Sequence, residues 1–188
     1  MENKFLIKAK QFFAMQGFLK PGGIMKQTTM NYLYYKHGAI YAAREAMLAV
    51  LHTGQDNDLE GIIARVPEPK KVGNEALISF APHENEGRTL LVPENIQYET
   101  YEGAHDYRIA ELEALVGGWE ASIDHEKRHG QTCLDVDLLQ DALKLIKKCS
   151  GNKSPKVKFN TGGAEGPTII EYAFGPVTLK IYLMPCRL

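Results

Sequence analysis

The sequence lacks a surplus of charge of either sign and lacks long apolar runs. Its 22 basic and 23 acidic residues nearly cancel, so no global field marks a nucleic-acid binder, although a local basic face is compatible with this balance. No apolar run approaches the roughly 20 residues that a membrane-spanning helix needs. The apolar share of 44% is ordinary for a globular chain and argues against a disordered one.

Cysteines are also scarce. Cys133, Cys149 and Cys186 are odd in number and lack metal-site spacing, which favours free thiols in a reducing compartment. Residues 1–4 do not resemble the start of a signal peptide. We therefore expect a cytoplasmic protein with no membrane partner.

The most regular pattern lies near the carboxyl end. Apolar residues recur at helical spacing from Leu138 to Cys149. Asp137 stands at the expected N-cap position, with Gln140 three residues later as in a capping box. The pattern predicts one helix followed by a three-stranded antiparallel meander, because glycine-bearing turns separate three further apolar runs. These runs are residues 156–159, 168–174 and 177–183.

The final five residues complete a resemblance to a known family. The carboxyl end of the chain resembles that of the bacterial DNA polymerase III beta sliding clamp. Both have a helix, three strands and a short ending, which here is Met-Pro-Cys-Arg-Leu. The family ends in Met-Pro-Met-Arg-Leu, so Cys186 replaces the second methionine. The resemblance covers roughly the last third of the chain. It implies an α+β, DNA-clamp-like domain of two halves, each a strand, a helix and three strands.

The first quarter repeats this plan loosely. Residues 4–8 predict a strand, residues 9–20 a helix, and His37-Gly38 a tight turn between two further strands. A third strand is expected over residues 46–52, although residues 42–51 favour a helix equally well by propensity.

The middle of the chain fits the family poorly. Residues 55–74 are polar and contain prolines, which predicts a loop or an arm. Two strands and a helix are expected after it, at residues 75–82, 89–101 and 106–119, with Gly117-Gly118 ending the helix. The predicted organisation is one clamp-like domain over residues 1–188. Its parts are a first half of about 1–54, an inserted, irregular middle of about 55–130 and a second half of about 131–188.

One short motif suggests different chemistry. His125 and His129 flank Glu126 in an H-E-x-x-H spacing, which on a helix would let both histidines bind zinc beside a general base. The two charged residues inside the motif, Gly130 directly after it and the missing third ligand all favour an exposed turn instead. A zinc-dependent metallopeptidase is therefore the alternative hypothesis, and no cofactor is expected otherwise.

The resemblance implies where function lies. In the family, helices line a ring and face the DNA backbone, so this chain would be a non-enzymatic processivity or tethering factor on duplex DNA, binding weakly and without sequence preference. The DNA-facing candidates are Lys144, Lys147, Lys148, Lys8 and Lys20.

The family also receives linear peptides of replication proteins in an apolar groove near its carboxyl end. The candidates here are Tyr182, Met184, Pro185, Cys186, Arg187 and Leu188. The family groove also uses a preceding domain for which this chain has no counterpart. A clamp-fold interaction module that serves protein partners without binding DNA is a further alternative. Family rings close from six domains, so we expect a homo-oligomer that forms through edge strands.

Overall fold

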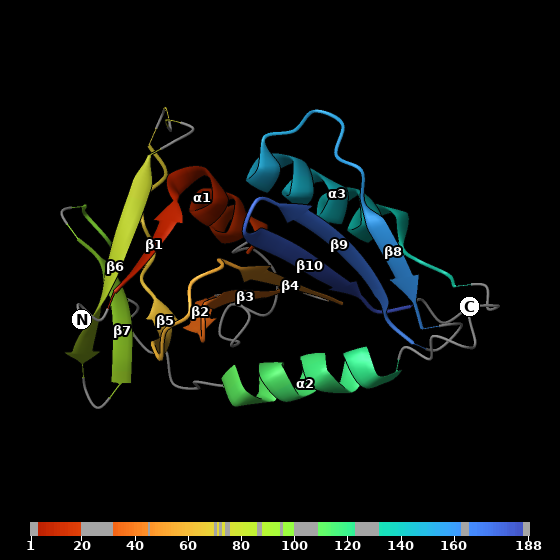
Figure 1. Cartoon of the computed structure of the whole chain (residues 1–188), viewed down its shortest axis with the longest axis horizontal. Coiled ribbons are helices and arrows are strands. Elements are labelled where there is room, and N and C mark those ends of the chain that lie inside the picture. Colours follow the sequence, from red (N-terminus) through yellow and green to blue (C-terminus); the bar gives the residue numbers. More distant parts are fainter. Residues whose placement is uncertain are drawn as a thin grey trace.

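The computed structural model describes residues 4–19, 32–44, 46–69, 71, 73, 76–85, 88–94, 96–99, 109–122, 132–162 and 166–185. Within these residues, three helices and ten strands follow one another along the chain (Figure 1). They are β1 (Phe5–Lys8), α1 (Ala9–Phe18), β2 (Leu33–Lys36), β3 (Ala39–Arg44), β4 (Met47–His52), β5 (Glu60–Ile63), β6 (Leu77–Asn85), β7 (Arg88–Pro93), α2 (Ile109–Ser122), α3 (Val136–Ser150), β8 (Lys158–Thr161), β9 (Thr168–Phe174) and β10 (Val177–Leu183).

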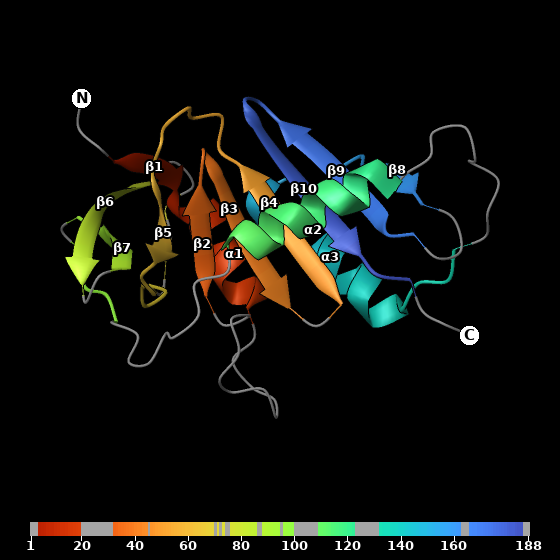
Figure 2. The same cartoon turned by 90° about the horizontal axis from the view of Figure 1, so that it is seen from below.

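The described strands form one mixed sheet in the order β1-β6-β7-β5-β2-β3-β4-β10-β9-β8. Neighbouring strands are antiparallel except β5 and β7, which are parallel. Helices α1 and α3 lie on one face of the sheet and α2 lies on the other (Figures 1 and 2). The predicted α+β class is thereby confirmed. No helix in the described ranges is long and apolar enough to cross a bilayer.

The carboxyl-terminal helix and meander form as predicted. Strands β8, β9 and β10 pair antiparallel in sequence order, and α3 packs on β9 and β10. The N-cap differs from the prediction, because the Asp135 carboxylate accepts hydrogen bonds from the backbone N–H groups of Asp137 and Leu138. The helix ends at Gly151, whose φ of 69° is the left-handed conformation that glycine adopts without strain.

The amino-terminal part has a similar order of helix and meander. Residues 42–44 belong to β3 and residues 47–51 to β4, so the strand and not the equally favoured helix forms here. His37 and Gly38 both have positive φ, as a tight hairpin turn requires. Strand β4 pairs with β10, from Met47 opposite Leu183 to His52 opposite Thr178, and so joins the two meanders into one surface.

The middle of the chain is more regular than predicted. The segment expected to be a loop or an arm contains β5, whose Ile62 and Ile63 are buried between β2 and β7. Helix α2 does not end at Gly117-Gly118 but continues to Ser122. An added Cβ at either glycine would meet no atom within 4 Å, so alanine would fit at both positions.

Two apolar cores lie on opposite faces of the sheet. The larger core fills the space under α1 and α3 and includes a stack of Phe5 on Tyr35 and on Phe80, with ring centroids 3.9 and 5.0 Å apart. The smaller core lies under α2 and includes Tyr34 and Tyr182. Each large side chain buried in this way stabilises the fold by about 1.5–3 kcal/mol.

Candidate nucleic-acid interface

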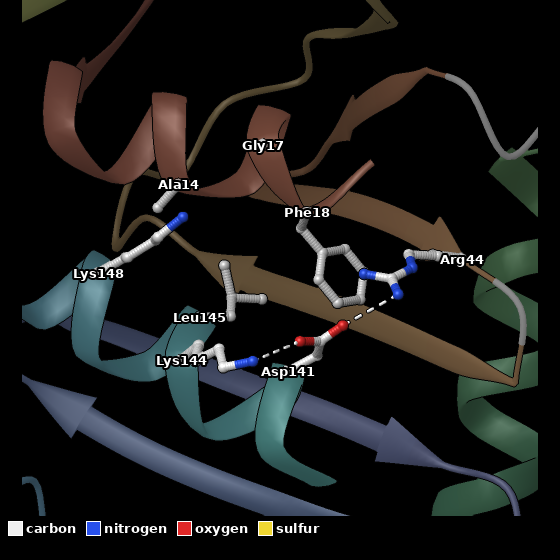
Figure 3. Close-up of a pocket in the computed structure, with 8 residues that line it drawn as sticks. All are labelled: Ala14, Gly17, Phe18, Arg44, Asp141, Lys144, Leu145 and Lys148. Atoms are coloured by element: carbon white, nitrogen blue, oxygen red, sulfur yellow. Dashed lines mark hydrogen bonds and ion pairs between the residues drawn. The ribbon is translucent and has the colours of Figure 1, made fainter. Parts of the chain in front are cut away.

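Helices α1 and α3 lie side by side (Figure 1). Their side chains leave a groove between them (Figure 3). The α1 side of the groove carries small residues, Ala14 and Gly17, and a Cβ added to Gly17 would meet nothing within 4 Å. The space has a volume of about 220 Å³. Its walls are formed by Ala14, Gly17, Phe18, Arg44, Asp141, Lys144, Leu145 and Lys148.

Arg44 anchors the charged network of this groove. It stands at the end of β3, and its guanidinium lies 2.9 Å from the Asp141 carboxylate and 6.0 Å from the centre of the Phe18 ring. The side chain is only 13% exposed, so the ion pair is well shielded from solvent. Asp141 also lies 3.2 Å from the Lys144 ammonium, so one carboxylate serves two cations.

The groove has a surplus of positive charge. Arg44, Lys144 and Lys148 contribute three cations against the single carboxylate of Asp141, which leaves a formal charge of +2 (3 − 1). Lys144 is 64% exposed, and Lys148 is exposed and reaches toward Ala14 across the groove (Figure 3). Exposed lysines around an arginine held in place suit a phosphate group, because ammonium and guanidinium groups both bind phosphate oxygens.

The other predicted DNA-facing lysines are placed differently. Lys147 is exposed on α3 but does not line the groove. Lys8 is exposed on β1, on the opposite side of the strand from Phe5 and Ile7, which pack in the core under α1 and α3. The structure therefore does not bring Lys8 to the groove. Lys20 lies outside the described residues.

Two cations were missed by sequence reasoning. The Lys10 ammonium lies against Gly151, at the negative end of α3, where the helix dipole favours a cation. The spacing of Lys10, Ala14 and Gly17 along α1 could have identified one helix face with small residues and a lysine. Arg44 had no comparable signal, because only the pairing of β3 and β4 beside the helices places it there.

The predicted peptide-groove residues do not all lie at the surface. Tyr182 is fully buried under α2, where its hydroxyl donates a hydrogen bond of 2.8 Å to Glu120 and its ring lies 5.7 Å from that of Trp119. Burial, followed by the contact with Glu120, raises the pKa of Tyr182. Met184 is 37% exposed and Pro185 is half-buried. Cys186, Arg187 and Leu188 lie outside the described residues.

The zinc-binding hypothesis cannot be placed in this structure, since His125, Glu126 and His129 lie outside the described residues. Among the residues that are described, no three His, Cys, Asp or Glu side chains are grouped as metal ligands would be.

No family model matches the chain, and no curated protein matches it. A solved structure, that of the proliferating cellular nuclear antigen from Entamoeba histolytica, is similar with a TM-score of 0.43 and 12% sequence identity over 100% of both chains. A similarity this low carries no argument about function. The family suggested by the carboxyl-terminal residues is therefore not established by these comparisons.

Proposed function

We propose that this chain is a non-enzymatic, clamp-like tethering or processivity factor that holds the backbone of duplex DNA against the face formed by α1 and α3. The observation that carries the proposal is the groove lined by Arg44, Lys144 and Lys148, in which Asp141 is the one carboxylate and contacts the first two of these cations. Lys147 and Lys10 extend the basic surface on α3 and α1. Lysine and arginine side chains on such a surface bind the phosphates of DNA and not its bases, so binding is weak and independent of sequence.

The clamp-like part of the proposal is supported by the order of elements. Each of two meanders follows a helix, α1 before β2-β3-β4 and α3 before β8-β9-β10. The meanders join through β4 and β10, and the two helices pack together on the same face. This is the arrangement that the resemblance implies for two halves of one domain over residues 1–188. In the described residues no strand directly precedes α3, so the second half is proposed with its first strand unassigned.

The proposed partners include a replication-protein peptide and further copies of the chain. The carboxyl-terminal residues Met184 to Leu188 are the proposed peptide contact, supported by the exposure of Met184 beside the end of β10. Tyr182 contributes to this surface only when α2 leaves it, because its ring and hydroxyl both contact that helix.

DNA binding is tested by exchanging charge in the groove. We expect the intact chain to bind duplex DNA with an affinity that falls steeply with salt. Lys144→Glu with Lys148→Glu should weaken binding at least tenfold at low salt. It should also lower the slope of log affinity against log salt by about 2, because two phosphates of the DNA are then no longer neutralised by a lysine.

A matched control changes the same charge elsewhere. Lys71→Glu with Lys156→Glu alters two exposed lysines outside the groove and outside β8, and should leave both affinity and salt slope near those of the unmodified chain. Equal losses in the two double variants would mean that net charge, and not the groove, governs binding. Binding that is independent of salt, or absent at every salt concentration, would leave the protein-interaction module as the better hypothesis.

The metallopeptidase alternative has its own test, which does not depend on DNA. Stoichiometric zinc in the purified protein that is lost in a His125→Ala variant would favour the enzyme. We expect no such zinc.

A further inference from the structure

Helix α2 covers the sheet on the face opposite the basic groove (Figures 1 and 2). Three apolar side chains at positions i, i+4 and i+7, those of Leu112, Val116 and Trp119, pack on the smaller core and stay partly exposed. Beneath them lies an apolar surface contributed by several strands. Its buried members are Tyr34, Ala39, Tyr41, Leu48, Val50, Ile62, Ile169 and Tyr182.

Two carboxylates hold α2 to this surface at points seven residues apart. Glu113 lies 3.0 Å from the Lys36 ammonium, which Glu60 of β5 also contacts at 3.2 Å. Burial, followed by the nearby charge of Glu113, raises the pKa of Tyr41 to about 12. Glu120 accepts hydrogen bonds of 2.6 Å from Lys180 and 2.8 Å from Tyr182. Each carboxylate therefore meets one lysine and one tyrosine of the sheet. A spacing of seven residues is two helical turns, so both carboxylates lie on one side of the helix.

The other described side chains in the middle of α2 contribute little to its attachment. Leu115 is 41% exposed, and Gly117 and Gly118 are exposed in the middle of the helix with no neighbour for an added Cβ. Glycine weakens a helix interior more than any residue except proline. The sheet surface, by contrast, is broad and apolar, with a lysine toward each end of the covering helix. The sheet surface therefore suits a more stable helix than α2.

We propose that this sheet face, the α2-covered face, is a docking surface for an amphipathic, acidic helix of a partner protein, and that α2 is the internal occupant which the partner replaces. The partner would carry apolar residues at i, i+4 and i+7 and carboxylates at i+1 and i+8, the pattern by which α2 itself is held. Charge complementarity to Lys36 and Lys180 selects the acidic helix. This inference goes beyond DNA tethering, since it concerns the other face of the sheet and requires no nucleic acid.

The test uses the full chain and a peptide that copies α2. The peptide comprises residues 109–122 with Gly117 and Gly118 replaced by alanine to favour the helix, and it carries a fluorescent label for anisotropy. In the chain, Glu113→Lys with Glu120→Lys releases α2. Trp119, the single tryptophan, reports the release as a red shift of its emission. We expect the peptide to bind this variant at least tenfold more tightly than the unmodified chain.

A reversed pair of charges provides the matched control. Lys36→Glu with Lys180→Glu also releases α2, but this chain should bind only a peptide that carries Glu113→Lys and Glu120→Lys and keeps Glu111. Of these two variants, only the Glu113→Lys, Glu120→Lys chain should bind the acidic peptide. This crossed specificity is required if the two lysines recognise carboxylates of the partner helix.

Several results would overturn the proposal. Both variants could keep their circular dichroism and bind neither peptide, or they could bind both peptides alike. Released chains could instead double in mass and exclude the peptide, which would make α2 of a second copy the occupant. Gly117→Ala with Gly118→Ala in the full chain is a variant expected to fold with a more stable α2. It should bind the acidic peptide more weakly than the unmodified chain does, because the peptide must displace this helix. Stronger binding would contradict the proposal. None of these outcomes depends on DNA binding, which is measured separately.

Discussion

At the scale of single residues, two glutamine side chains hydrogen-bond to an extended backbone as a neighbouring strand would. The Gln16 amide donates to the Val66 carbonyl at 2.7 Å and accepts from the Val66 N–H at 2.9 Å. Gln55 makes the same pair of contacts with Leu6, on β1 at one edge of the sheet. Both amides satisfy backbone groups that no strand in the described part of the chain reaches. Gln55 thereby blocks part of an edge that could pair with another chain.

Replacing Gln16 by methionine should lower the free energy of unfolding by about 1–3 kcal/mol, because two partly buried backbone groups of Val66 lose their partners. Urea unfolding followed by circular dichroism measures the change. Gln140→Met, at an exposed position of α3, is the control and should change stability little. Equal effects of the two substitutions would show that the Gln16 contacts contribute nothing.

The cap of α3 provides a second prediction at this scale. Asp135→Ala should cost about 1 kcal/mol of stability because it removes the acceptor for two N–H groups of the first turn. Asp137→Ala should cost less, since Asp137 lies in the first turn and contributes only through the helix dipole. Urea unfolding measures both changes. A larger loss of stability in the Asp137→Ala variant would support Asp137 as the N-cap, as the sequence predicted.

At the scale of elements, the attachment of α2 depends on pH. Burial alone would raise the pKa of Glu120, but the hydrogen bonds from Lys180 and Tyr182 outweigh it and leave that pKa below the ordinary value. A carboxylate with a lowered pKa in the folded state stabilises that state above its unfolded pKa and loses this effect as pH falls through the folded value. Of the neighbouring groups, His52 has a pKa lowered by burial and by Lys180, so it stays neutral near pH 7.

We therefore expect acid to release α2 below about pH 4.5, the ordinary range of the glutamate carboxyl. Trp119 emission should shift to the red in that range, before the far-ultraviolet circular dichroism of the sheet changes. Glu120→Gln should remove most of this step, because its amide cannot form the ion pair with Lys180. A step of unchanged size in the Glu120→Gln chain would assign it to other carboxyl groups.

At the scale of the whole molecule, the two edges of the sheet differ. The β1 edge carries the Gln55 contacts, whereas the β8 edge has an exposed aromatic residue, Phe159, at 48% exposure. An edge strand with unpaired backbone groups and an adjacent apolar side chain is suited to pairing with a second strand. We expect self-association of the chain to use β8.

Light scattering should accordingly give a mass above 21.0 kDa for the intact chain. Phe159→Glu should return it to the mass of one chain, because a carboxylate at the edge disfavours strand pairing. Val136→Glu, at a position 65% exposed on α3, is the matched control and should leave the mass unchanged. Identical masses for the intact chain and both variants would exclude association through β8.

Local pattern determined much of the secondary structure. The helical period between Leu138 and Cys149, followed by glycine-separated apolar runs, was sufficient to predict α3 and its meander. The exposure of Lys144 and Lys148 was predicted in the same way, since a helix exposes the side opposite its apolar stripe. These features depend on residues close together in the chain, which is why the sequence alone specifies them.

Interactions between distant segments decided the rest. The insertion of β5 between β2 and β7 depends on pairings that no local period records, and so does the placing of Arg44 beside Asp141. The burial of Tyr182 beneath Trp119 likewise joins residues from two separate elements. A regular spacing of apolar residues predicts that one face of a helix or strand will be buried. It does not predict which element covers that face, because burial of apolar surface is non-directional. Only the tertiary structure selects the partner, and with it the basic groove on one face and the α2-covered face on the other.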